Sequence, residues 1–68
     1  MTPADVHRCV MQIQKLANDD NYEDAHLLED ELYLSVLSAI ADGSCDNPAE
    51  CARTAIKAAK IDFSRYHA

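Results

Sequence analysis

The chain has 68 residues, and its twelve acidic and six basic side chains give a formal net charge of -6 at pH 7. This length allows a single domain, whose core would supply a net stability of only about 3–5 kcal/mol. The excess of acid argues against a surface that binds nucleic acid throughout. The longest apolar run, residues 32–41, is interrupted by serines and is shorter than the roughly 20 residues that cross a bilayer. We therefore expect a soluble protein that does not enter a membrane.

The cysteines indicate a reducing compartment. There are three, an odd number, without a CxxC pair, and no signal peptide precedes them. These features predict a cytoplasmic protein, with association between chains as the supplement to a small core. The spacing typical of zinc fingers is missing, so we expect no metal and no cofactor. The residues that could have formed such a site are Cys9, Cys45, Cys51, His7, His26 and His67.

A first helix is predicted over residues 3–17. Thr2 can cap its N-terminus, Pro3 suits the first helical position, and Asp5 places a carboxylate where the helix dipole favours one. Apolar residues then recur at helical spacing, and they are Val6, Cys9, Val10, Ile13, Leu16 and Ala17.

A second helix, the longest element, is predicted over residues 21–41. Asp20 and Glu23 resemble a capping box at its start, and Gly43 suits a left-handed cap at its end. Its broad apolar arc contains Tyr22, Ala25, Leu28, Leu32, Tyr33, Val36 and Ile40.

A third helix is predicted over residues 48–65. Asn47 can cap it, Pro48 suits its first position, and one apolar face continues as far as Tyr66. Ile61 lies nearly opposite that face, so either the helix breaks near Lys60 or Ile61 contacts something outside the monomer. Three helices without a strand pattern predict an all-α domain, a helical hairpin plus a third helix.

The apolar surface of the second helix is larger than one face can explain. Leu27, Leu34 and Leu37 carry it round to another side of the helix. A helix with so narrow a polar strip needs neighbours on more than one side, and three short helices can hardly supply them. We therefore expect a homodimeric bundle.

Charge is distributed unevenly. Residues 19–50 contain ten acids and no Lys or Arg, whereas Arg53, Lys57 and Lys60 form a basic stripe on the third helix, with Arg65 further along. One interpretation is a solvated surface with complementary charge on the second and third helices. The other is a surface that binds a partner.

Glu29 lies inside the apolar arc, where an unpaired carboxylate would be costly. It needs a donor such as His26, a tyrosine hydroxyl or Arg65. The contact could fix how the helices register, or His26 and Glu29 could supply an acid/base pair or two metal ligands. The candidate binding residues are Glu23, His26, Glu29, Asp30, Tyr33 and Arg65.

Three segments carry a family resemblance, and they are Asp24-Ala25-His26-x-x-Glu29-Asp30-x-Leu32, Val36-Leu37-x-x-Ile40-Ala41-x-Gly43 and Ile61-Asp62-Phe63-Ser64-Arg65-Tyr66. In them the chain resembles short orphan reading frames of phages and prophages, over about residues 20–68. Tyr66 stands where that group more often has Trp. The resemblance implies a small accessory protein in a bacterial host, where such chains commonly bind and redirect a host protein.

The leading hypothesis is a non-enzymatic protein-interaction module that binds or inhibits a host or phage protein. It would use the acidic second helix or the exposed apolar side. A first alternative is a metal-dependent hydrolase or nucleotide-handling protein that uses His26 and Glu29, with Asp30 or Glu23 as further ligands from two subunits. A second is nucleic-acid binding through the basic stripe, or a DNA-mimicking inhibitor that uses the acids. Both rank below protein binding.

Overall fold

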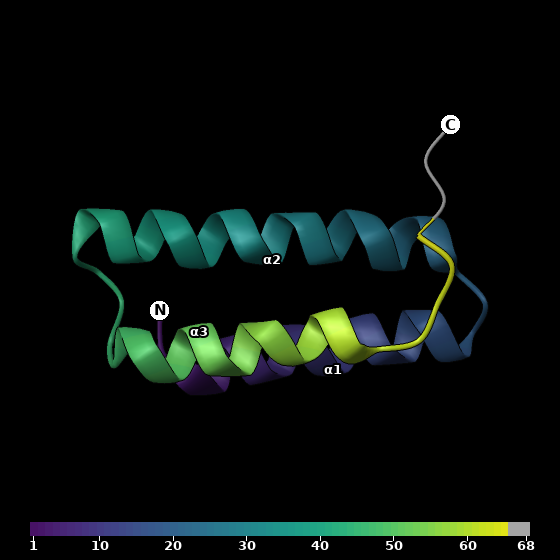
Figure 1. Cartoon of the computed structure of the whole chain (residues 1–68), viewed down its shortest axis with the longest axis horizontal. Helices are drawn as coiled ribbons and strands as arrows, with labels where there is room; N and C mark the ends of the chain where they lie inside the picture. Colours follow the sequence, from purple (N-terminus) through teal and green to yellow (C-terminus); the bar gives the residue numbers. More distant parts are fainter. Residues whose placement is uncertain (66–68) are drawn as a thin grey trace.

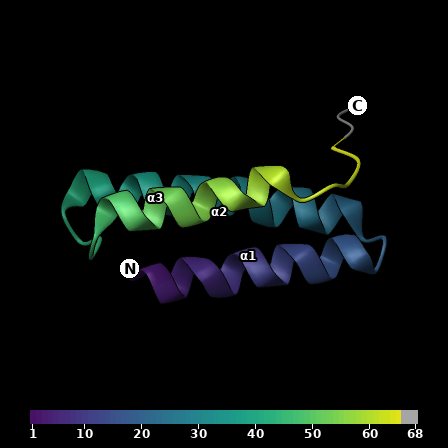
Figure 2. The ribbon, with the colours of Figure 1, turned by 60° about the horizontal axis from the view of Figure 1, so that its bottom comes forward.

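The computed structural model describes residues 1–65, which form three α-helices and one short 3-10 helix, with no strand in this range. The elements are α1 (Pro3–Asn18), α2 (Tyr22–Asp42), α3 (Pro48–Ile56) and η1 (Lys57–Lys60). Successive helices run in opposite directions along the long axis, so α2 is antiparallel to both other helices (Figure 1). Turned by 60°, the ribbon shows α1 as a separate rod beneath α2 and α3 (Figure 2). The prediction of an all-α, three-helix domain is confirmed.

The start of α1 follows the predicted logic. The Thr2 side chain accepts a hydrogen bond from the Asp5 backbone N–H, and Asp5 Oδ2 accepts one from the Thr2 N–H at 2.9 Å. Two backbone donors that the helix leaves unpaired are thereby satisfied. The hydrogen bonds to Thr2 lower the pKa of the partly exposed Asp5 carboxyl below its ordinary value, which keeps it charged at the positive end of the helix dipole.

The start of α2 differs from the prediction, because no capping box forms there. Asp20 takes the left-handed conformation at φ 58°, and Asn21, the residue that precedes the helix, makes no capping bond to the backbone. The Asn21 amide donates instead to the Asp24 carboxylate at 3.0 Å. The end of α2 is as expected, since Gly43 adopts φ 78° and its N–H bonds back to Ile40.

The end of α3 corrects the expected helix over residues 48–65. The α-helix stops at Ile56, η1 ends at Lys60, Ile61 has an extended backbone, and residues 62–65 form neither helix nor strand. Ile61 and Phe63 are both buried while Asp62 between them is exposed, which is the period-two pattern of an extended segment. A continuous helix would have turned Ile61 away from the core. Of the two alternatives, the break near Lys60 is confirmed, and Ile61 needs no contact outside the monomer because it is 7% exposed. Tyr66 and His67 lie outside the described residues.

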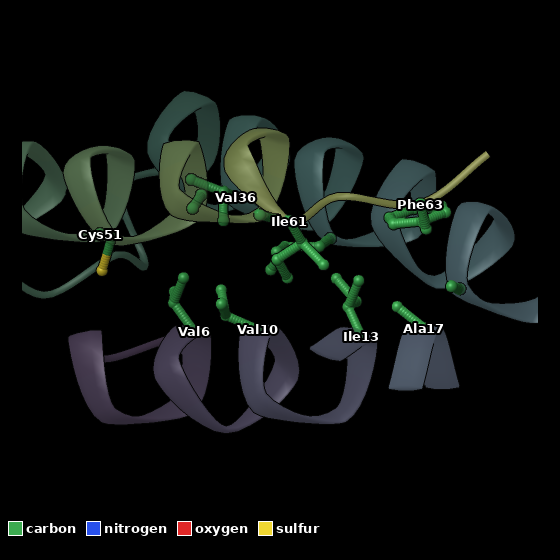
Figure 3. Close-up of a cluster of buried hydrophobic side chains, with 12 residues drawn as sticks. Val6, Val10, Ile13, Ala17, Val36, Cys51, Ile61 and Phe63 are labelled. Atoms are coloured by element: carbon green, nitrogen blue, oxygen red, sulfur yellow. The ribbon is translucent and has the colours of Figure 1, made fainter. Parts of the chain in front are cut away.

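The core lies between α1 and the other elements. α1 packs against α2, α3 and η1, whereas α2 and α3 contact each other less closely. Figure 3 shows side chains of α1 meeting those of α2, α3 and the extended segment in one apolar layer. Within the described chain, the apolar cluster comprises Val6, Val10, Ile13, Ala17, Ala25, Leu32, Val36, Cys51, Ala55, Ala58, Ile61 and Phe63.

Candidate functional site

Glu29 is a charged residue in the buried seam of α2, with its side chain only 5% exposed. It follows Ala25 by one turn and precedes Leu32 by almost one turn, so it faces inward with them. Its carboxylate is fully engaged. Oε1 accepts from Arg65 Nε at 3.0 Å, and Oε2 accepts from Arg65 Nη2 at 3.0 Å and from the Tyr33 hydroxyl at 3.1 Å. A tyrosine hydroxyl and Arg65, both expected from the sequence as donors, are therefore present at this carboxylate.

The extended segment after η1 brings Arg65 to this carboxylate. Arg65 lies 36 residues after Glu29 in the chain, and its guanidinium also donates to the Ala58 carbonyl at 3.0 Å. The same group stacks on the Phe63 ring, 3.8 Å from the centroid, and Phe63 stacks in turn on Tyr22. This planar, two-bonded contact is the geometry that a guanidinium supplies and an ammonium does not.

The ion pair changes the acidity of its neighbours. The hydrogen bond that Arg65 donates to Glu29 raises the pKa of Arg65 above its ordinary value, so the guanidinium stays charged. Burial and the hydrogen bond to Glu29 raise the pKa of Tyr33 to about 12, so its hydroxyl stays protonated and remains a donor. With both oxygens of Glu29 occupied, the arrangement is suited to hold the extended segment on α2 rather than to transfer a proton.

His26 and Asp30 lie beside this pair on the same helix. His26 Nε2 is 3.6 Å from Asp30 Oδ1, and one ligand atom each from His26, Glu29 and Asp30 falls within a group 4.8 Å across. A cation at this place would compete with Arg65 for the Glu29 carboxylate. Glu23, the further ligand considered from the sequence, is exposed in the first turn of α2 and is not a member of this group. Of the other five predicted residues, four lie around Glu29, namely His26, Asp30, Tyr33 and Arg65, and Glu23 lies apart.

The basic stripe is shorter than expected. Because the chain leaves the helix after Lys60, Arg65 turns inward to Glu29 and does not extend the stripe. Arg53 pairs with Glu50 on its own helix at 3.7 Å. Arg65 is therefore not part of the stripe, and the charge of Arg53 is partly neutralised by Glu50. Both facts weaken the case for phosphate binding.

The large apolar side chains that remain exposed are concentrated on α2. Leu27, Leu34 and Leu37 are 54%, 68% and 64% exposed. The sequence predicted that these leucines would extend beyond one face, and the structure places them outside the monomer core. Two members of the expected arc, Tyr22 and Ile40, are also exposed, at 38% and 39%.

A shallow apolar groove between α2 and α3 was not anticipated. Its volume is about 280 Å³. The α2 wall continues the exposed leucine surface, and the α3 wall includes Ile56, which is 57% exposed. The leucines of α2 could have indicated the α2 wall of this groove from the sequence. The α3 wall could not be predicted, because it forms only where α3 packs beside α2. The lining residues are Tyr33, Val36, Leu37, Ile40, Ala52, Ala55 and Ile56.

Two thiols lie close together near the start of α3, Cys45 in the connection between α2 and α3 and Cys51 within α3 itself. Cys45 and Cys51 both donate to the Asp46 carbonyl, at 3.8 Å and 3.3 Å. Burial and the neighbouring Cys45 thiol raise the pKa of Cys51 to about 11. Cys51 is therefore an unreactive core residue at neutral pH rather than a nucleophile.

Comparisons with protein-family models, with curated proteins and with solved structures gave no match for this chain. The resemblance to phage reading frames accordingly stays a prediction. Among the described residues, no helix combines the length and apolar character that a bilayer span requires.

Proposed function

We propose that the chain is a non-enzymatic protein-interaction module, an accessory protein of a phage or prophage that binds or inhibits a protein of its bacterial host. The observation that carries this proposal is the outer face of α2. Leu27 and Leu34 stand seven residues apart on that face and are more than half exposed. Exposed leucines rimmed by charged side chains are typical of a surface that binds another protein.

The charge around these leucines suggests the chemistry of the partner. Glu23, Asp30 and Glu31 are exposed on the same helix, and residues 19–50 contain no Lys or Arg. A complementary surface would present an apolar centre with basic residues around it. The module acts in the cytoplasm as a homodimer in this proposal.

A pull-down with matched variants tests the proposal. Tagged protein is incubated with a bacterial lysate at near-physiological salt, and the retained proteins are compared between the wild type and a Leu27→Ser, Leu34→Ser double variant. The control is Met11→Ser on α1, because Met11 is similarly exposed at 55%. We expect a protein retained by the wild type and the control and lost from the double variant. Absence of any retained protein, or equal retention by all three, contradicts the proposal.

A metal-dependent hydrolase or nucleotide-handling protein is the second candidate, favoured by the grouping of His26, Glu29 and Asp30. It predicts that Mg, Mn or Zn raises the melting temperature of the wild type, and that His26→Ala removes the increase. Because Arg65 already neutralises Glu29, we rank this function below protein binding. No thermal shift with any of the three metals would dispose of it.

Nucleic-acid binding and DNA mimicry rank lower still. The first predicts a salt-dependent mobility shift of DNA through Lys57, Lys60 and Arg53. The second predicts that the protein releases a DNA-binding partner from DNA. Neither gains support from the arrangement of the cations and acids.

A further inference from the structure

Cys45 and Cys51 form a pair of thiols at the N-terminal end of α3. Both sulfurs donate to the same carbonyl oxygen, that of Asp46, at 3.8 Å from Cys45 and 3.3 Å from Cys51. Two groups that share one acceptor atom at these distances must lie near each other. They are also in direct contact, because burial and a side-chain hydrogen bond with Cys45 raise the pKa of Cys51 to about 11. The chain therefore holds two of its three cysteine sulfurs side by side.

The backbone between the two cysteines brings them together. Asn47 adopts the left-handed conformation at φ 55°, and α3 begins directly after it at Pro48. The Cys51 N–H donates to the Asn47 carbonyl at 3.0 Å, so Cys51 lies one helical turn beyond the residue at which the chain changes direction. The Asp46 N–H donates to the Met1 carbonyl at 2.8 Å and fixes the connection on its other side. Backbone contacts on both sides thus position the pair.

The two thiols differ in their access to solvent. Cys51 is 0% exposed and belongs to the apolar cluster, and Figure 3 shows its sulfur at one end of that layer. Cys45 is only partly buried. A reagent from solution can therefore reach Cys45 but not Cys51. An accessible thiol poised next to a second thiol is typical of cysteines that respond to oxidants.

From this geometry we propose that Cys45 and Cys51 are a reversible oxidation site, at which a hydroperoxide converts the two thiols into an intramolecular disulfide. The structure describes the reduced form, in which both cysteines are free. Disulfides in reducing compartments are usually transient and formed in response to oxidants. The disulfide would tie the connection between α2 and α3 to the first turns of α3. The site does not depend on the proposed function, because it involves neither the outer face of α2 nor a partner.

The reaction takes two steps and consumes one molecule of hydrogen peroxide. In the first step the Cys45 sulfur, as a thiolate, attacks one peroxide oxygen. The S–O bond forms, the O–O bond breaks, and the other oxygen leaves as water, so Cys45 becomes a sulfenic acid and the peroxide is reduced by two electrons. In the second step the Cys51 sulfur attacks the Cys45 sulfur. The S–S bond forms, the S–O bond breaks, and the departing hydroxide takes the Cys51 proton and leaves as a second water.

The raised pKa of Cys51 decides the order of these steps. A thiol with a pKa of about 11 is almost entirely protonated at neutral pH, so Cys51 is inert toward reagents in solution. Its reaction with the sulfenic sulfur of Cys45 is intramolecular, and proximity raises the effective concentration of an adjacent group. Oxidation of Cys45 also removes the thiol that contributes to the raised pKa. Cys51 is therefore the second thiol to react.

Mass spectrometry after peroxide treatment tests the pair. Folded protein is treated with hydrogen peroxide, and the remaining thiols are alkylated. We expect the chain to lose the mass of two hydrogen atoms and to keep one of its three thiols, that of Cys9. Cleavage by a glutamyl endopeptidase after Glu50 identifies the link, because Glu50 lies between Cys45 and Cys51 and only a disulfide then holds the two peptides together. Dithiothreitol should restore all three thiols.

Cys9 supplies the matched control. It lies on α1, and burial together with the negative charge of Glu31 raises its pKa, which disfavours its oxidation. Cys9→Ser should therefore form the disulfide as the wild type does. Cys45→Ser should keep its thiols at least about tenfold longer than the wild type, because the accessible sulfur is gone.

A variant of the buried cysteine separates the two steps. Cys51→Ala should accumulate the sulfenic acid of Cys45, which a 1,3-diketone reagent traps. Circular dichroism establishes that each variant folds, and Cys45→Ser carries the test alone if Cys51→Ala does not fold. Three results would overturn the proposal. They are a wild type that keeps all three thiols, a disulfide that involves Cys9 or joins two chains, and a Cys45→Ser variant that loses its thiols as fast as the wild type.

Discussion

The side of α2 that faces α3 has a closed half and an open half. Before Tyr33, the extended segment with Phe63 and Arg65 covers the helix, and the buried Glu29 carboxylate holds the segment in place. After Tyr33, α3 leaves a groove in which Leu37 is 64% exposed. The difference shows that the chain satisfies the buried charge of Glu29 internally and leaves apolar surface exposed at the other half. Stability and, in the function that we propose, association thus depend on different parts of one helix.

The largest predicted difference comes from the same substitution in two settings. Leu32→Ala removes a side chain that is 4% exposed, and we expect a loss of about 3 kcal/mol in the free energy of unfolding, which is most of the net stability of a core this small. Leu37→Ala should cost under about 0.5 kcal/mol, because the side chain is 64% exposed. Urea titration measures both. Equal losses would show that the open half is buried within the monomer.

Opening the closed half should have the next largest effect. Arg65→Ala removes both guanidinium hydrogen bonds from the buried Glu29 carboxylate and leaves the bond from the Tyr33 hydroxyl, and we expect a loss of about 2 kcal/mol. The estimate is below the usual range for a buried pair because the Arg65 side chain is 29% exposed. Arg53→Ala, which breaks the exposed pair with Glu50, should cost under about 0.5 kcal/mol. Similar values for the two variants would mean that Glu29 finds water when Arg65 is removed.

Gly43 sets the point where the open half ends. Its φ of 78° disfavours a side chain, although a Cβ atom there would meet nothing within 4 Å. Gly43→Ala should therefore cost about 1 kcal/mol through the backbone alone. Gly43→Asn should cost less, because Asn tolerates the left-handed conformation. Thermal unfolding compares the variants, and equal costs would contradict a purely conformational cause.

The smallest effect is expected at the boundary of the two halves. Tyr33→Phe leaves both Arg65 bonds to Glu29 intact, so the loss at neutral pH should be about 0.5 kcal/mol. In the wild type the pKa of Tyr33 is raised from 10.0 to about 12. Its contribution to stability is complete below pH 10 and is lost as pH rises toward 12, because the unfolded tyrosine ionises first. Between pH 10 and 12 the free energy of unfolding should fall less steeply with pH in the variant than in the wild type. Identical slopes in the two proteins would contradict the raised pKa of Tyr33.

Much of the fold could be predicted from local sequence signals. The Thr2–Asp5 box and Gly43 mark ends of helices through backbone chemistry that acts within a few residues. The capping box expected at Asp20 did not form, because the turn adopts a left-handed residue there instead. The sequence also predicted that Glu29 needs a hydrogen-bond donor, because a carboxylate within an apolar arc can stay buried only when it is paired.

The sequence by itself determined the helical class, the first two helices and the burial of Glu29, because spacing and capping are local properties. Only the tertiary structure decided where α3 ends and which donors reach Glu29. The apolar face of residues 52–66 favoured a continuous helix, but burial of Ile61 together with Phe63 requires an extended chain. That break carries Arg65 across to α2, and the groove opens where α3 packs beside Leu37. These features depend on contacts between residues far apart in the chain, which no local pattern records.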